Sequence, residues 1–350
     1  MSRTHISELG ELIDPAASRY LKPCDIDGYP PEQLTGLLRT MLLIRRTEEQ
    51  IAEWVEAGRV HCPCHLGIGQ EAVATGVAAA LRPSDRLFGN HRSHAHYLAA
   101  GGGLYALLAE VLGRADGCCG GMGGSMHLRS LAHGFFGSVP IVAATIPIAV
   151  GAGLAARMDG KGDIAVAFFG DGACEEGVLH ESLNLAAVYE VPVLFVCENN
   201  QYSSHLDIAL RQPSDRISRY AEAHRVRAQL VDGNDVTAVA HASAELVGAA
   251  RRDRAPVFLE AVTYRWRGHV GPKEDVDVGV RRSMEDLAAW KRRDPVKRLQ
   301  QALLDAQLAS DAQLRELEAQ VRDEVHLAAV RALDAPWPVE SSLLGYVYAP

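Results

Sequence analysis

The sequence lacks the features that mark nucleic-acid-binding, membrane-spanning and disulfide-stabilised proteins. Its 350 residues carry a formal net charge of −9, whereas binding to nucleic acid favours a basic face. No apolar run is long enough to cross a bilayer, so we expect no membrane partner. The amino terminus lacks the apolar core of a signal peptide, and seven irregularly placed cysteines are too few for a disulfide scaffold. We therefore expect a cytoplasmic protein with reduced thiols.

The composition is that of a globular protein with material for a large core. Hydrophobic residues make up 48% of the chain and charged residues 23%, which is typical of folded domains. The length allows one large α/β domain with extensions, or two domains. The chain shows no internal repeat and no low-complexity tail, so repeat architectures are not expected.

The most informative stretch, residues 164–202, predicts a β-α-β unit. Ile164–Phe169 and Val193–Val196 are apolar runs typical of buried parallel strands. Between them, Glu175–Tyr189 has the apolar spacing of an amphipathic helix. Open α/β sheets bind ligands at the carboxyl ends of their strands, so the residues that follow the two runs are candidates for a binding site.

Polar residues follow both predicted strands. Asp171 stands between Gly170 and Gly172 after the first strand and offers a carboxylate oxygen, while Asn200 follows the second and offers an amide oxygen. The carbonyl of Tyr202 can supply a third ligand. Three protein oxygens suit Mg²⁺, which completes an octahedral shell with phosphate oxygens and water. The helix N-terminus after Gly172 adds backbone N–H groups for the same anion, so the sequence predicts a magnesium–phosphate site.

The sequence of this stretch, GDGACEEG…HESLNLAAVYEVPVLFVCENNQY, resembles that of the α subunit of the thiamine-diphosphate-dependent first component of 2-oxo acid dehydrogenase complexes. That family includes pyruvate, branched-chain 2-oxo acid and acetoin dehydrogenases. The resemblance covers roughly residues 32 to 345 and implies an α/β fold, a doubly wound, mostly parallel sheet of the thiamine-diphosphate-binding type. It divides the chain into an N-terminal arm (1–31), a diphosphate-binding domain (32–282) and a C-terminal helical extension (283–350) packed on that domain.

The resemblance also implies roles for individual side chains. HLGIGQEAVATG matches the family segment that places a catalytic histidine near the reacting carbon, so His65 would orient the substrate carboxylate or exchange protons. Arg92 stands where an arginine pairs with the diphosphate, and His91 beside it replaces the usual tyrosine as a cofactor contact. Arg265 and His269, after another predicted strand, would approach the diphosphate, with His269 also catalytic.

Two further segments of the resemblance concern the cofactor. Residues 138–143, SVPIVA, align with the strand that binds the aminopyrimidine ring through backbone groups. The contacts would come from Pro140, which keeps its carbonyl acceptor, and Val142. The remaining cofactor-binding residues implied by the motif are Asp171, Gly172, Ala173 and Asn200, and the implied metal ligands are Asp171, Asn200 and Tyr202.

The resemblance implies that the chain holds only half of an active site. In the family, the pyrimidine-binding half and an activating glutamate come from a β subunit, so we expect an α₂β₂ assembly, with a lipoyl-bearing acyltransferase as a further partner. The implied reaction is decarboxylation of a small 2-oxo acid and transfer of the acyl group to a lipoyl acceptor. Acetoin cleavage or carboligation stays open as an alternative, because residues 271–282 differ from the pyruvate-type loop.

Two other interpretations start from local patterns. Residues 151–156 read G-x-G-x-x-A, with Asp171 about twenty residues later, as in NAD-binding oxidoreductases, although close helix–sheet packing explains the small residues equally well. His61, Cys62, Cys64 and His65 are candidate zinc ligands, but residues this close rarely reach one tetrahedral ion and no second cysteine pair follows at zinc-finger spacing.

Overall fold

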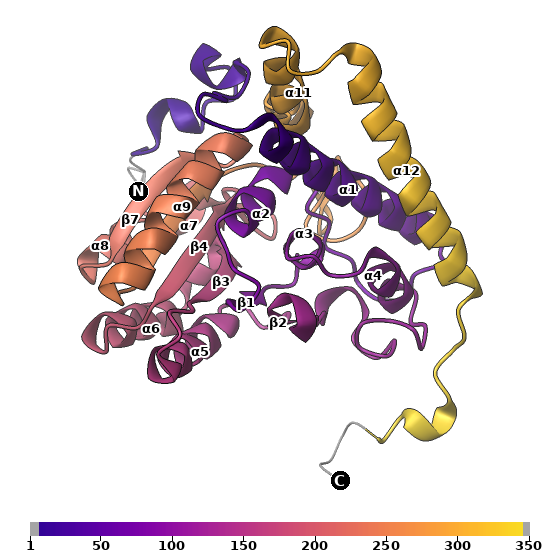
Figure 1. Ribbon diagram of the computed structural model, residues 1–350, viewed down its shortest axis with the longest axis horizontal. Coiled ribbons are helices and arrows are strands. Elements are labelled where there is room, and N and C mark those ends of the chain that lie inside the picture. Colours follow the sequence, from indigo (N-terminus) through magenta and orange to yellow (C-terminus); the bar gives the residue numbers. More distant parts are fainter. Residues whose placement is uncertain (1–6, 346–350) are drawn as a thin grey trace.

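A six-stranded parallel sheet forms the centre of the computed structural model, which describes residues 7–345 (Figure 1). The strand order is β2-β1-β3-β4-β8-β7. The strands are β1 (Arg86–Gly89), β2 (Phe135–Ser138), β3 (Ala165–Gly170), β4 (Val193–Asn199), β7 (Arg227–Asp232) and β8 (Val257–Val262). Because the order reverses beside β1, the sheet has a topological switch point between β1 and β3.

Helices cover both faces of this sheet, because its strands are apolar on both sides. Val166 and Phe168 of β3 join the core on one face, and Ala167 and Phe169 join the core on the other. The first face packs against α1 (Pro31–Glu56), α2 (Glu71–Ala78), α3 (His94–Ala99), α4 (Leu104–Val111) and α9 (Val236–Asp253). The second packs against α5 (Thr145–Asp159), α6 (Gly177–Val188) and α8 (Arg219–Ala223). The predicted doubly wound α/β class is confirmed.

The predicted β-α-β unit is present, with small shifts at its boundaries. The two apolar runs form β3 and β4, which pair in parallel from Ala165 opposite Val193 to Gly170 opposite Glu198. The helix between them is α6, and a short 3₁₀ turn, η5 (Asp171–Glu175), precedes it. The polar residues after the two strands therefore reach the same edge of the sheet, as the sequence predicts.

The prediction that residues 138–143 belong to a strand is wrong, because the strand β2 ends at Ser138. The following residues form a turn that leads into α5, with Ala143 at a φ of 64°. Pro140 has no backbone N–H and cannot continue a ladder of strand hydrogen bonds, which explains the early end. Backbone contacts of Pro140 and Val142 to a ligand would thus come from a turn.

The G-x-G-x-x-A pattern lies inside α5 and does not form a strand-to-helix turn, so the NAD-binding interpretation is not supported. A Cβ atom added at Gly153 would lie 2.8 Å from Cγ1 of Val191 and 3.1 Å from the carbonyl oxygen of Pro192. Glycine at this position lets α5 approach the sheet closely. The packing alternative therefore accounts for these small residues.

Terminal segments pack around the sheet. The described part of the arm contains the turns η1 (Gly10–Leu12) and η2 (Ser18–Leu21). Its residues Leu9 and Leu12 lie against Tyr264 and Trp290. The C-terminal helices are α10 (Met284–Lys291), α11 (Pro295–Asp305) and α12 (Asp311–Asp334), with the turn η6 (Glu340–Ser342) after them. Helices α11 and α12 lie along α1 (Figure 1). The predicted boundaries at 31/32 and 282/283 stay predictions, and their outer ends, residues 1–6 and 346–350, lie outside the described residues.

Short elements complete the chain between these helices and strands. They are the turns η3 (Gly124–Met126) and η4 (Leu131–His133), the hairpins β5 (Tyr202–Ser203) with β6 (Leu206–Asp207) and β9 (Val276–Asp277) with β10 (Val280–Arg281), and α7 (Ile208–Arg211). None of the helices in residues 7–345 combines the length and apolarity that a bilayer crossing requires.

Candidate active site

A cavity of about 190 Å³ lies at the carboxyl ends of β1, β3 and β4, next to the switch point of the sheet. Open α/β sheets bind ligands at this place because the strand ends diverge there. The cavity is lined by side chains or backbone of eight of the predicted site residues, namely His91, Arg92, Val142, Gly172, Ala173, Asn200, Tyr202 and His269. The other four, His65, Pro140, Asp171 and Arg265, lie outside this lining.

Asp171 lies at the end of β3 and is completely buried. Its Oδ2 atom forms an ion pair with Arg211, while its Oδ1 atom is buried without a hydrogen-bond partner. Burial raises the pKa of Asp171 above its ordinary value, and the positive charge of Arg211 acts in the opposite direction. One oxygen of this carboxylate is thus free to accept a cation.

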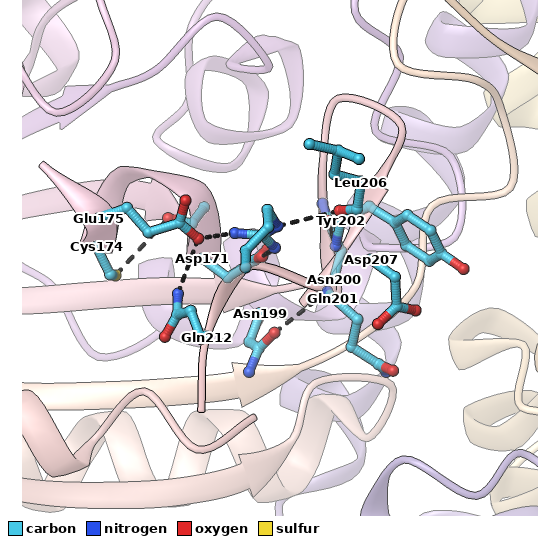
Figure 2. Close-up of polar contacts among 12 residues, drawn as sticks. Asp171, Cys174, Glu175, Asn199, Asn200, Gln201, Tyr202, Leu206, Asp207 and Gln212 are labelled. Atoms are coloured by element: carbon cyan, nitrogen blue, oxygen red, sulfur yellow. Dashed lines mark hydrogen bonds and ion pairs between the residues drawn. The ribbon is translucent and has the colours of Figure 1, made fainter. Parts of the chain in front are cut away.

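Asn200 and Tyr202 approach the same edge from β4. Oδ1 of Asn200 accepts the backbone N–H of Tyr202 at 3.2 Å, and Nδ2 donates to Oε1 of Gln70 at 3.3 Å. Gln70 fixes the amide so that its oxygen faces the turn that carries Tyr202. In Figure 2, Asn200 and Tyr202 lie together at the start of the hairpin, and Asp171 follows the neighbouring strand.

The donors at this edge fit a hard divalent cation. The unpartnered carboxylate oxygen of Asp171, the amide oxygen of Asn200 and the backbone carbonyl of Tyr202 are all oxygen ligands of the kind that Mg²⁺ takes. The two segments are in contact, since a Cβ atom added at Gly172 would lie 2.6 Å from Oγ of Ser203. The residue types and the free oxygen of Asp171 therefore suit the predicted magnesium site.

Three histidines meet beside the cavity. The ring centroids of His65 and His91 lie 4.6 Å apart, those of His65 and His269 4.9 Å, and those of His91 and His269 5.4 Å. Burial, followed by the charge of Arg92, lowers the pKa of His65 to about 3, that of His91 to about 2 and that of His269 to about 4. All three rings are therefore neutral at pH 7 and can take part in hydrogen bonds as donor and acceptor. Nδ1 of His65 is buried without a partner, so this atom is available to a ligand.

These imidazoles also form one of two groups of possible metal-binding side chains within the described residues. The other group is Glu110, Cys118 and Cys119. The alternative zinc site, in which Cys62 and Cys64 would join His61 and His65, is in neither group, and both cysteines are free thiols. The zinc interpretation is therefore not supported.

The two predicted arginines differ in their surroundings. Arg92 lines the cavity, where its guanidinium donates to the carbonyl oxygens of Leu66 at 2.6 Å and of His269 at 3.3 Å. Burial lowers the pKa of Arg92 to about 9, so a nearby anion would stabilise its charge. Arg265 instead makes a buried, two-fold contact with Asp277, at 2.9 and 2.7 Å. Its predicted contact with a diphosphate stays a prediction.

Sequence reasoning missed several residues of this region. Gln70 and Glu198 both line the cavity, and Glu198 lies 3.2 Å from Nε2 of the buried His96. Gln70 lies inside the motif HLGIGQEA and Glu198 inside the motif ENNQY. The motifs could therefore have indicated both residues as candidates for the site. Arg211 had no such signal, because the short helix α7, which ends at Arg211, lies outside the predicted motifs.

The fold and these donors define a class of protein, an α/β protein built to bind a ligand at the carboxyl edge of its sheet. Comparison with known families gives the specific assignment. Residues 39–340 match the family described as "Dehydrogenase E1 component". The chain therefore belongs to the dehydrogenase E1 component family.

Curated relatives place it further within that family. It is 34% identical over 322 residues to the pyruvate dehydrogenase E1 component subunit alpha of Rickettsia prowazekii (strain Madrid E), covering 91% of this chain and 98% of the relative. It is 37% identical over 314 residues to the protein of that name from Zymomonas mobilis, covering 89% of this chain and 87% of the relative. The protein is an α subunit of the 2-oxo acid dehydrogenase type, a thiamine-diphosphate-dependent class of enzyme.

Proposed function

We propose that this α subunit binds the diphosphate of thiamine diphosphate through Mg²⁺ at the carboxyl ends of β3 and β4. The observation that carries the proposal is the buried, unpartnered Oδ1 of Asp171, which lies next to the turn that carries Asn200 and Tyr202. Asp171, Asn200 and Tyr202 would hold the ion, and the backbone of Gly172 and Ala173 would face the phosphate from the 3₁₀ turn η5, which precedes α6.

When bound, thiamine diphosphate supplies the carbon nucleophile and the electron sink for decarboxylation. The residues of the chain bind and orient the reactants. Arg92 presents a buried guanidinium to the cavity, where it can pair with a phosphate. His65, His91 and His269 are neutral at pH 7, so each ring offers one nitrogen that donates a hydrogen bond and one that accepts a hydrogen bond from a bound reactant.

A β subunit completes the site in this proposal, within an α₂β₂ assembly. Ile141 and Val142 line the cavity yet are 70% and 50% exposed, so its wall is open to solvent on one side. Further exposed apolar side chains lie on α5 and α6, namely Ile148, Leu154, Met158, Leu185 and Val188. Large exposed apolar side chains gathered near a cavity are typical of a surface that another protein covers. It supports a partner that covers the cavity, and a lipoyl-bearing acyltransferase would then receive the acyl group.

We propose a small 2-oxo acid as the substrate, with pyruvate as the first candidate because the relatives carry that name. Acetoin cleavage or carboligation is the second candidate. The feature that favours it is the sequence of residues 271–282, which differs from the pyruvate-type loop. The cytoplasmic location expected from the sequence stays a prediction.

Calorimetric titration with thiamine diphosphate and Mg²⁺ tests the proposal. We expect tight binding by the complex of this chain with its β subunit, weak binding by the chain alone, and loss of Mg²⁺-dependent binding in Asp171→Asn. Unchanged binding by Asp171→Asn would exclude the proposed metal site. Tight, activity-competent binding by the chain alone would exclude the shared site. Parallel assays of CO₂ release and acyloin formation by the complex separate the two candidate reactions.

A further inference from the structure

Arg211 lies against the proposed metal ligands although the motif does not contain it. It is the last residue of α7 and its guanidinium pairs through Nη2 with Oδ2 of Asp171 and through Nη1 with Glu175. The side chain of Arg211 is 6% exposed and that of Asp171 is 1% exposed. The contact is thus an internal one, which water screens weakly.

Because of this contact, the two carboxylate oxygens of Asp171 have different surroundings. Oδ2 is held by the guanidinium, whereas Oδ1 is buried and has no hydrogen-bond partner. A buried carboxylate oxygen without a partner costs free energy, and a bound cation removes that cost. Because Arg211 occupies only one oxygen, an ion can bind the other while the ion pair stays in place.

Arg211 is itself fixed from several sides. Its Nε atom donates to the carbonyl oxygen of Leu206 at 3.1 Å, within the hairpin that precedes α7. Glu175, which accepts from the other half of the guanidinium, also accepts from Nε2 of Gln212 at 3.0 Å. In Figure 2, Glu175 and Gln212 lie next to Asp171, and Leu206 lies in the hairpin with Tyr202. A planar guanidinium held at three points has one orientation and imposes it on the carboxylate.

One segment thereby contributes to the metal site twice. Residues 202–212 begin with Tyr202, the proposed carbonyl ligand, and contain Arg211 near their end. Ser203 packs against Gly172, directly after Asp171. The position of this segment therefore sets both a ligand and the orientation of the carboxylate.

We propose that Arg211 is a positioning residue for Mg²⁺ binding, which holds Oδ2 of Asp171 so that Oδ1 faces the ion. The proposal rests on the metal site of the proposed function. Carboxylates that bind metals are commonly held by an outer hydrogen-bond partner, and loss of such a partner reduces metal affinity about 10–100-fold. Arg211 has this relation to Asp171.

The test measures Mn²⁺ affinity, with free Mn²⁺ read by electron paramagnetic resonance in the presence of thiamine diphosphate. It uses the full chain in complex with its β subunit. Arg211→Met removes the donors but keeps an unbranched side chain, and we expect Mn²⁺ to bind about 10–100-fold more weakly. Arg211→Lys keeps the charge and one donor group, and it should recover part of that loss. Arg216→Met is the matched control, because Arg216 lies in the same region but pairs with Glu8 and Glu222 at the surface.

Asp171→Asn separates this proposal from the one on which it rests. If Asp171→Asn abolishes Mn²⁺ binding and Arg211→Met binds as the parent does or more tightly, Arg211 has no positioning role. If Asp171→Asn binds normally, or if the parent binds no Mn²⁺, the metal site and the role of Arg211 fail together. Circular dichroism checks folding. Should Arg211→Met unfold, Glu175→Gln loosens the guanidinium from its other side, and unchanged affinity in both Glu175→Gln and Arg211→Lys would overturn the proposal.

Discussion

The carboxylate of Glu110 accepts the backbone N–H of Gly123 at 2.7 Å from inside the glycine-rich segment 117–124. The same carboxylate accepts the N–H groups of Cys119 at 2.7 Å and of Gly121 and Gly124 at 3.0 Å. Glu110 is completely buried at the end of α4. One side chain therefore satisfies four backbone donors in a segment that has little regular structure.

Glu110→Gln should destabilise the protein and loosen this segment. The amide retains one acceptor oxygen but places an NH₂ group against backbone donors, so two N–H groups lose their partner, at a cost of about 1–3 kcal/mol each. Urea unfolding measures the loss, and limited proteolysis within 117–124 reports the loosening. The surface variant Glu316→Gln is the control, since Glu316 accepts a hydrogen bond from Gln320 at an exposed position. Equal stability of both variants would contradict the expectation.

Acidification should destabilise the fold through the three histidines at the cavity. Their pKa values in the folded protein, about 3 for His65, about 2 for His91 and about 4 for His269, lie below the ordinary value of 6.5. Below about pH 6.5 the unfolded chain therefore binds more protons than the folded one, and stability falls as the pH falls towards about 4. Each ring contributes at most about 1.4 kcal/mol per pH unit in that window.

His91→Phe should make the loss of stability between pH 7 and pH 5 smaller, because one of these rings no longer titrates in the unfolded chain. Urea unfolding of the full chain at both pH values measures the difference. His241→Gln is the control, since His241 is exposed on α9 and pairs only weakly with Glu245 at 3.8 Å. An unchanged pH dependence in His91→Phe would show that the pKa of His91 is the same in the folded and the unfolded protein.

Gly172→Ala should displace the hairpin that carries Tyr202. The added Cβ atom would lie 2.6 Å from Oγ and 2.9 Å from Cβ of Ser203, closer than atoms in folded proteins approach. Overpacking of this kind typically costs about 1–3 kcal/mol. The double variant Gly172→Ala/Ser203→Gly removes both clashing atoms and should regain most of the stability. A double variant no more stable than Gly172→Ala would place the cause elsewhere, and thermal unfolding decides between the two.

Asp277→Asn should be strongly destabilising. The side chains of Asp277 and Arg265 are 2% and 1% exposed, and the variant leaves the guanidinium buried without its counter-charge. Breaking a buried ion pair from one side costs about 3–5 kcal/mol. Asp275→Asn, two residues earlier on the exposed face of the same loop, should change stability little. Thermal unfolding compares the pair, and similar melting temperatures would contradict a structural role for Asp277.

The sequence allowed prediction of the fold and of the sheet edge at which the proposed metal donors lie, because both depend on local order along the chain. Asp171 and Asn200 each follow an apolar strand, and neighbouring parallel strands bring such positions to one edge. The early end of β2 was missed, although Pro140 was a signal for it. The resemblance supplied His65, His91 and His269 singly, but only the tertiary fold brings the three rings within 5.4 Å.

The ion-pair partners of the buried residues Asp171 and Arg265 could not be predicted from the sequence, for a physical reason. Arg211 and Asp277 lie in segments without hydrophobic periodicity, so nothing in the sequence indicates where their side chains point. The sequence suggested that Arg265 can bind a phosphate. Its counter-charge, Asp277, lies twelve residues further along the chain, so the sequence did not reveal the pair. An arginine in a motif identifies a possible anion site, but the structure is needed to know whether another carboxylate already neutralises it.

The exposed apolar rim formed by Ile141 and Val142 has a consequence for when the subunit can work. A protein surface that covers this rim would exclude water from it and strengthen the electrostatic contacts inside the cavity. In the proposed assembly, binding of the β subunit would therefore also make the residues of this cavity more effective.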